Sequence, residues 1–73
     1  PATSLRAITP SDSTTYDPPL RALYVGVAGN LAVIGEDDTA AVTIPNAQVG
    51  YHALMVKKVM STNTTATSIV GLR

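Results

Sequence analysis

The hydrophobic positions of this chain form short runs, rich in β-branched residues and separated by turn residues. This pattern is typical of a small all-β fold, and no stretch has the spacing of an amphipathic helix. Residues 20–26 and 31–34 are apolar at successive positions apart from Arg21, so we expect strands covered on both faces, between two layers or at a subunit contact. Residues 39–44 alternate instead, which leaves one face more polar. The expected strands cover residues 20–26, 31–34, 39–44, 51–60 and 69–72.

The start of the chain reads as an edge strand or an arm that ends before Pro10 and is followed by a polar loop. Pro18 and Pro19 then remove two backbone donors, so the regular sheet should begin just after them. The predicted fold is a small antiparallel β-sandwich or barrel of five to six strands with an extended N-terminal arm. Its expected parts are residues 1–19, the arm and loop, and residues 20–73, the β-sandwich domain.

The stretch Gly-Val-Ala-Gly-Asn at residues 26–30 can be interpreted as a loop that cradles a ligand or as a turn. Phosphate-binding loops are followed by a helix whose N-terminal amides face the anion, whereas here the apolar run 31–34 follows. Gly and Asn both tolerate the positive φ of a hairpin turn. We therefore predict a hairpin turn here, and further turns at residues 35–38 and 45–50.

The composition indicates an ordered domain with a thin core. Of 73 residues, 45% are hydrophobic, but there are three Tyr and no Trp or Phe, so smaller side chains must fill the interior. The chain has no Cys and one His, which excludes disulfides and a zinc site, so we expect no metal and no cofactor. Association with other subunits is the remaining common source of stability for so small a chain.

Charge and hydropathy exclude several classes of partner. Five Lys and Arg balance five Asp and Glu, so no basic field is available to hold a phosphate backbone, and we expect no nucleic-acid partner. The uncharged run 22–35 is too short and too interrupted by Gly to span a bilayer, and the start of the chain lacks a signal-peptide pattern, so we expect no membrane partner. We expect synthesis in a cytoplasm, with Pro1 exposed by removal of an initiator Met.

Few residues suggest chemistry. The acidic run 36–38 does not have the spacing of an EF-hand loop and is interpreted as a solvated hairpin tip. Asp12 and Asp17 flank a Ser/Thr loop and are expected to form side-chain turns or to cap the local backbone. His52 has no obvious acidic or thiol companion and is interpreted as structural. A Gly-x-Ser-x-Gly nucleophile motif is absent, so we predict that the chain is not an enzyme.

Contact with other proteins is the function that the residues favour. Arg21 stands in an otherwise apolar strand, and Arg is enriched where protein surfaces meet, although an edge position in solvent explains it equally well. The pair Lys57 and Lys58 puts one charge on each face of a strand, which suits a polar contact across a subunit boundary as well as it suits water. The predicted interface residues are Leu5, Ile8, Tyr16, Arg21, Leu23, Tyr24, Lys57 and Lys58.

Four segments resemble one family of small virion proteins. The chain has Ile-Thr-Pro-Ser-Asp at residues 8–12, Arg-Ala-Leu-Tyr-Val-Gly-Val-Ala-Gly at 21–29, Lys-Lys-Val at 57–59 and Asn-Thr-Thr-Ala-Thr-Ser-Ile-Val at 63–70. These are similar to the head spike base family of alphaproteobacterial gene transfer agents and related tailed phages. The sequence departs from that pattern at Asn63, where the family has Gly, and slightly within residues 27–28.

This resemblance implies a β-rich, non-enzymatic virion protein on the capsid surface. It would act as the base of a head spike or fibre, or as a decoration (cement) protein between capsomers. The implied partners are further copies of the chain, as a trimer or pentamer, the major capsid protein, and a spike or fibre protein. The alternative is a receptor- or polysaccharide-binding module of a phage fibre or tail, for which Tyr16 and Tyr51 would be the aromatic contacts.

Overall fold

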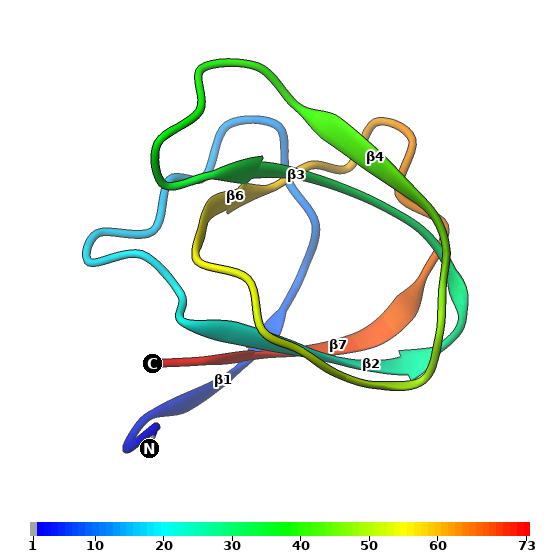
Figure 1. Cartoon of the computed structure of the whole chain (residues 1–73), viewed down its shortest axis with the longest axis horizontal. Helices are drawn as coiled ribbons and strands as arrows, with labels where there is room; N and C mark the ends of the chain where they lie inside the picture. Colours follow the sequence, from blue (N-terminus) through cyan, green and yellow to red (C-terminus); the bar gives the residue numbers. More distant parts are fainter. Residues whose placement is uncertain (1) are drawn as a thin grey trace.

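The computed structural model describes residues 2–73, and these residues fold into seven strands without a helix (Figure 1). The strands are β1 (Leu5–Ile8), β2 (Ala22–Val27), β3 (Gly29–Gly35), β4 (Val42–Ala47), β5 (Gly50–His52), β6 (Val56–Val59) and β7 (Thr67–Leu72). A four-stranded sheet has the order β1-β7-β2-β5, a three-stranded sheet has the order β4-β3-β6, and every pairing is antiparallel. The predicted all-β antiparallel fold is confirmed, with seven strands instead of five to six.

The centre of the fold is one long hairpin that bends in the middle and contributes to both sheets. Its first half is β2 followed by β3, and its second half is β4 followed by β5. Tyr24 pairs with Tyr51 in the four-stranded sheet, and Leu31 pairs with Ile44 in the three-stranded sheet. The backbone N–H of Asp38 donates to the carbonyl of Gly35 at 3.0 Å, which confirms the turn predicted at residues 35–38.

The prediction of a hairpin turn at residues 26–30 is wrong, because β2 and β3 belong to different sheets. These residues bend the chain from one sheet into the other. Neither Gly26 nor Gly29 has a positive φ; both are needed for close approach. A Cβ on Gly26 would lie 2.6 Å from the Cβ of Ser68, and a Cβ on Gly29 would lie 2.6 Å from the backbone nitrogen of Ala66.

The strand predicted at residues 39–44 and the turn predicted at 45–50 are both displaced. The observed strand β4 runs through Pro45 and Asn46, and the chain reaches β5 after Gln48 and Val49. Asn46 has a φ of 51°, and the register between β3 and β4 shifts beside it, so the Pro-Asn pair marks a β-bulge within the strand. Turn-forming residues here mark an irregularity of the ladder and not its end.

The long strand predicted at residues 51–60 is two strands in different sheets. β5 pairs with β2, and β6 pairs with β3, while residues 53–55 carry the chain from one sheet to the other. The apolar run does not break between the two strands because Leu54, in the connection, packs against the core that β6 also lines. The last strand, predicted at residues 69–72, is confirmed and begins at Thr67.

The N-terminal segment is hydrogen-bonded to both sheets. β1 is the edge strand of the four-stranded sheet, as one of the two sequence interpretations predicted. Residues 11–20 then follow the free side of β6, where the N–H groups of Ser11, Tyr16 and Leu20 donate to the carbonyls of Val59, Lys57 and Val56 at 2.9, 2.7 and 2.9 Å. The division into an arm, residues 1–19, and a domain stays a prediction, and Pro1 lies outside the described residues.

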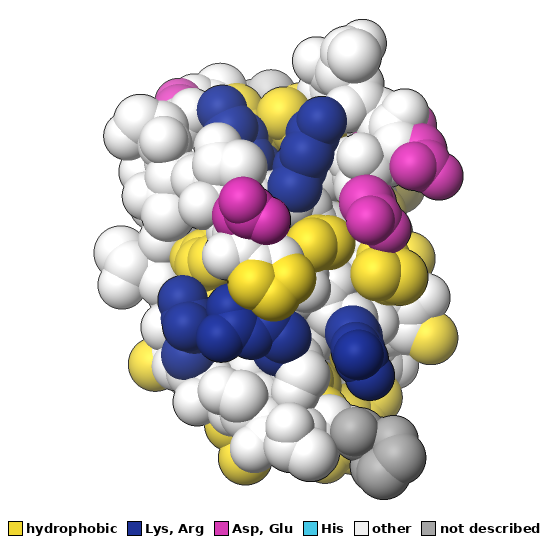
Figure 2. Space-filling model, turned by 90° about the vertical axis from the view of Figure 1, so that its left-hand side faces the viewer, with side chains coloured by type: hydrophobic (Ala, Val, Ile, Leu, Met, Phe, Trp, Pro, Cys, Tyr) yellow, Lys and Arg dark blue, Asp and Glu magenta, His cyan; other side chains and the backbone are white. Residues whose placement is uncertain are grey.

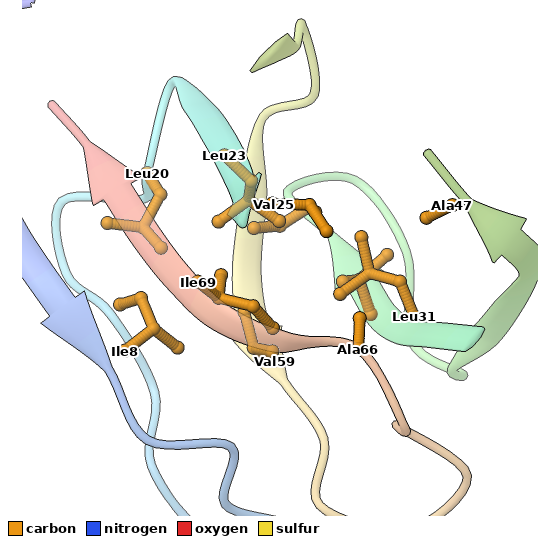
Figure 3. Packing of buried hydrophobic residues seen from close by; sticks show 11 residues of the cluster. Ile8, Leu20, Leu23, Val25, Leu31, Ala47, Val59, Ala66 and Ile69 are labelled. Carbon is orange, nitrogen blue, oxygen red and sulfur yellow. The ribbon is translucent and has the colours of Figure 1, made fainter. Parts of the chain in front are cut away.

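The hydrophobic core lies between the two sheets and is built from aliphatic side chains (Figure 3). Its members come from every strand except β5, and from segments 9–20 and 60–66, so segments far apart in the sequence meet there. The fully buried large side chains are Leu20, Leu23, Leu31, Val25, Val56 and Val59. No charged or polar residue is buried among residues 2–73, which leaves every described charge accessible to solvent or to a partner.

Candidate functional site

Among residues 2–73 no pocket is found, and no three His, Cys, Asp or Glu side chains gather where they could hold a metal ion. No helix in this part of the chain is long and apolar enough to cross a membrane. The acidic run 36–38 forms the tip of the long hairpin. Surfaces, and not cavities, are therefore the candidate functional sites.

His52 has a structural role, as the sequence predicted. Its Nε2 lies 2.8 Å from the backbone carbonyl of Gln48. This contact spans the short connection between β4 and β5, where the chain passes from one sheet to the other. The ring nitrogen is therefore used in holding this bend.

The Asp12 carboxylate accepts hydrogen bonds from backbone N–H groups, as predicted, but these groups belong to residues 61 and 62 and not to its own loop. Its Oδ1 accepts hydrogen bonds from the N–H groups of Ser61 and Thr62 at 2.9 and 3.0 Å, and its Oδ2 accepts one from the hydroxyl of Thr62. These hydrogen bonds, that of the Thr62 hydroxyl first, lower the pKa of Asp12 from 3.8 to about 2 because they favour the charged carboxylate. The Asp12 carboxylate thus fastens the N-terminal segment to the turn after β6.

The threonine-rich segment 61–67 is a second structural contact. The Thr64 hydroxyl accepts a hydrogen bond from the N–H of Ala32 at 3.0 Å, and the Thr65 hydroxyl accepts one from the N–H of Asn30 at 2.8 Å. These residues run beside β3 where β6 has ended. Asn63 has a φ of 69°, a left-handed conformation that Gly adopts freely and that Asn tolerates. The threonine-rich segment is therefore hydrogen-bonded to β3 through Thr64 and Thr65, and to the N-terminal segment through Thr62.

Two predicted interface residues are unavailable to a partner. Ile8 and Leu23 are buried in the core of the single chain, at 7% and 0% exposure. Both lie on strands of the four-stranded sheet, in cross-strand rows that face the three-stranded sheet. The sequence pattern identified them as apolar but not which face of the sheet they occupy, so the prediction that they lie at an interface is corrected.

Four predicted interface residues lie on or near β6. Lys57 and Lys58 are part of this strand, Tyr16 lies in the segment 11–20 that runs alongside it, and Arg21 follows that segment. Tyr16 is half-buried, packs against the core and has the Arg6 guanidinium carbon 5.8 Å from the centre of its ring, within the range of a cation–π contact. The side chain of Arg21 is exposed, and the two lysines are half-buried. The face drawn in Figure 2 shows two groups of Lys and Arg side chains with hydrophobic and acidic side chains between them. We call the surface around Arg21, Lys57 and Lys58 the charged side.

Leu5 and Tyr24 belong to a different surface, the outer face of the four-stranded sheet. Side chains alternate along a strand, and the rows containing Ile8 and Leu23 face inward, so the rows between them face outward. The Tyr24 and Tyr51 rings pack edge to face in one of these rows, with centroids 5.2 Å apart. We call this surface the tyrosine face. Its residues are Leu5, Ala7, Ala22, Tyr24, Tyr51 and Val70, and Leu72 lies in the same outward rows but is buried, at 8% exposure.

The sequence analysis missed most of the tyrosine face. It did not single out Ala7, Val70 or Leu72, and it considered Tyr51 for glycan binding alone. Their common feature is the cross-strand register, which brings residues 7, 70, 24 and 51 into one row across all four strands. The sequence signal that could have indicated this face is the run of successive apolar positions in residues 20–26 and 69–72, which places apolar side chains on both faces of each strand.

A solved structure supplies a relative of the whole chain. No protein-family model matches the chain, and no curated protein matches it. A structure described as the capsid of a native gene transfer agent (GTA) particle, computed with C5 symmetry, contains a chain that is 34% identical to this one. The match covers 100% of this chain and 84% of that one, with a TM-score of 0.83. This chain belongs to the family of that GTA capsid chain. Family membership is consistent with the resemblance seen in the sequence, which ran over nearly the whole chain.

Proposed function

We propose that this chain is a non-enzymatic structural protein of a phage or GTA particle, bound to the outer surface of the capsid. The single observation that carries the proposal is the match, over its full length, to a chain of a GTA capsid. Residues 2–73 contain no detected pocket and bury no charged side chain, and both findings agree with a structural role. Within that role we propose the base of a head spike or fibre, or a decoration (cement) protein, as a trimer or pentamer.

The charged side is the surface that we assign to the capsid. Arg21 is exposed there, Lys57 and Lys58 keep part of their surface, and Arg and Lys make contacts that steer and orient a partner. We propose the major capsid protein as that partner, and a spike or fibre protein as a further one. A polar contact of this kind suits a protein that joins a preformed shell from solution, because long-range charge attraction speeds association.

Attachment to purified capsid shells that lack this protein tests the proposal directly. The chain should co-sediment with the shells at low ionic strength, and the Arg21→Glu/Lys57→Glu variant should need roughly tenfold more protein for the same occupancy. Val42→Glu is the matched control, because Val42 is 60% exposed on β4, the edge strand opposite β6 in the three-stranded sheet. Failure of the unaltered chain to bind any shell would contradict the proposed function.

The alternative of a receptor- or polysaccharide-binding module has less support. Tyr16 packs against the core beneath Arg6, while Tyr51 lies at the far edge of the four-stranded sheet, so the two do not form a joint platform. The neighbouring pair Tyr24 and Tyr51 meets edge to face at 66°, which does not offer two coplanar rings to a sugar chain. Binding to a glycan array would revive this alternative.

A further inference from the structure

The strand β4 is an edge of the three-stranded sheet that the rest of the described chain leaves uncovered (Figure 1). It pairs with β3 on one side, and no strand of residues 2–73 lies on its other side. The opposite edge of this sheet, β6, has residues 11–20 running alongside it. The edge strands of the other sheet are shorter, since β5 has three residues and β1 has four, one of them Arg6. β4 has six residues and none of the charged side chains that commonly protect such an edge.

The hydrogen bonds of β3 show which backbone groups of β4 are open. The carbonyl of Ala32 accepts a hydrogen bond from the N–H of Met60 at 2.9 Å, and the N–H of Ala32 donates to the Thr64 hydroxyl at 3.0 Å. Both groups of Ala32 therefore point away from β4. Thr43 lies opposite Ala32, and in an antiparallel pair that exchanges no hydrogen bonds the groups of both residues point outward. The N–H and carbonyl of Thr43 thus face the uncovered side.

The open part of β4 is short and has a defined end. Backbone direction alternates along a strand, so Pro45 faces the same side as Thr43. Pro45 offers a carbonyl but no N–H, and the β-bulge at Asn46 interrupts the ladder just beyond it. The open edge is therefore residues 42–45, with Thr43 as its one position that presents both a donor and an acceptor.

The side chains of this edge indicate which kind of strand fits beside it. Val42 and Ile44 are in register with residues of β3 that face the core. Ile44 packs against the core, but Val42 stays 60% exposed. A strand added beside β4 would cover Val42 with an apolar side chain of its own and would place a polar one opposite Thr43.

We infer that the open edge of β4 binds an extended segment of another protein, which adds an antiparallel strand to the three-stranded sheet. Open backbone donors and acceptors along a strand are complementary to an extended peptide backbone, and this mode of recognition gains affinity from main-chain hydrogen bonds. The bound segment has apolar residues at alternate positions. Its C-terminal end lies toward the start of β4, where the exposed acidic residues 36–38 favour a basic side chain.

Residues 2–73 contain no free segment that could supply this strand. The strand β1 pairs with β7, and the N–H groups of Thr3 and Ser4 donate to the carbonyl of Arg73 at 2.8 and 2.9 Å, so both described ends are held at the four-stranded sheet. The inference rests on the proposed function in one respect. A chain held to the capsid by its charged side, at β6, leaves the opposite edge of that sheet to a further protein of the particle.

Backbone amide NMR of the isolated chain, titrated with a synthetic peptide of alternating valine and threonine that ends in lysine, tests the inference. Without peptide, the Thr43 amide should exchange with solvent faster than the amides of Val42 and Ile44, which face β3. The peptide should slow exchange at Thr43 in a saturable way. Thr43→Pro removes the donor and should weaken peptide binding roughly tenfold or more. Pro45 already occupies an outward position of this strand, so folding, checked by circular dichroism, should be retained.

Thr43→Ala is the matched control, because it changes the same side chain but keeps the backbone N–H. It should bind the peptide like the unaltered chain. A peptide methylated at its threonine nitrogens has no donor for the Thr43 carbonyl and should bind at least roughly tenfold more weakly, which tests the inference even if Thr43→Pro does not fold.

Three results would overturn the inference: a Thr43 amide that is protected without peptide, no binding of the peptide, or equal binding of the methylated peptide. Protection of Thr43 that rises with protein concentration alone would also overturn it, because the occupant would then be a second copy of the chain. Since the measurement contains no capsid, its failure is distinguishable from failure to attach to shells, which would overturn the proposed function instead.

Discussion

The outer faces of the two sheets begin from similar sequences and end in different environments. In β3, Leu31 and Val33 face the core, while Ala32 and Ile34 point to the opposite side and are still buried, at 1% and 8% exposure. In the four-stranded sheet the outward residues Leu5 and Tyr51 are mostly exposed. Both sheets contain strands that are apolar on both faces. On the four-stranded sheet the outward Leu72 is as buried as Ile34, at 8% exposure, and the exposed outward residues Leu5 and Tyr51 lie on the edge strands β1 and β5.

The two outer faces also differ in the residues that lie opposite their outward side chains on neighbouring strands. Ala32 pairs with Thr43, and Ile34 pairs with Lys58, so polar side chains flank the apolar ones on the outer face of the three-stranded sheet. The aliphatic stem of a lysine covers apolar neighbours while its ammonium group stays in water. The central row of the tyrosine face contains no such residue. Polar side chains thus flank the buried outward residues of the three-stranded sheet, whereas the exposed outward residues Leu5 and Tyr51 lie on edge strands with fewer neighbours.

The largest expected effect is a difference in the free energy of unfolding between truncating an outward residue of the three-stranded sheet and truncating one of the four-stranded sheet. Ile34→Ala should lower the free energy of unfolding by about 2–5 kcal/mol, because it removes buried atoms and leaves a cavity. Leu5→Ala, on the open face, should change it by less than about 0.5 kcal/mol in the isolated chain. Urea unfolding of both variants measures the difference. Similar losses would mean that the two outer faces are equally buried.

A smaller effect is expected where the threonine-rich segment runs beside β3. Asn63→Ala should cost about 1–2 kcal/mol, because alanine is strained at a φ of 69°. Asn63→Gly should be close to neutral, since glycine adopts this conformation freely. Thermal or urea unfolding compares the two variants. A more stable Ala than Gly variant would argue against a left-handed residue at this position.

The smallest effect concerns the Asp12 carboxylate, and it should appear as a pH dependence. The folded-state pKa of Asp12 is about 2 and its ordinary value is 3.8, so the stabilisation is present above pH 3.8 and is lost as the pH falls toward 2. Asp12→Asn should lower stability at neutral pH and flatten the loss between neutral pH and pH 2. Urea midpoints measured across this range provide the comparison.

Asp37→Asn is the control for that measurement, because it removes an equal formal charge at the hairpin tip. Its stability should fall with acid as steeply as that of the unaltered chain. If the stability of Asp12→Asn also fell with acid as steeply as that of the unaltered chain, the Asp12 carboxylate would not be the group that holds residues 61 and 62 to the N-terminal segment.

The parts of the fold that depend on local pattern were predictable. The all-β class, the last strand near residues 69–72 and the turn at 35–38 follow from β-branched runs and turn residues, and each is present. The parts that depend on pairing were not. The segment Tyr51–Met60 was expected to be one strand because its apolar pattern does not break where the chain changes sheets.

The interface shows the same limit. Leu5 and Leu23 are both leucines in strands of one sheet, but one is exposed and the other is at the centre of the core. A shift of one position along a strand exchanges inside for outside, and nothing in the local composition states which applies. Arg21 and Lys57, by contrast, could be expected near the surface from their charge alone.

By itself the sequence determined that this is a small all-β chain without cysteine, and it carried the resemblance to a capsid family. Those properties follow from residue types and short-range spacing. Tertiary structure alone decided that Asp12 caps a turn 50 residues away, that two glycines serve close approach, and that residues 7, 70, 24 and 51 make one open face. The reason is physical, because hydrogen bonds between strands join positions whose separation in sequence has no local signature.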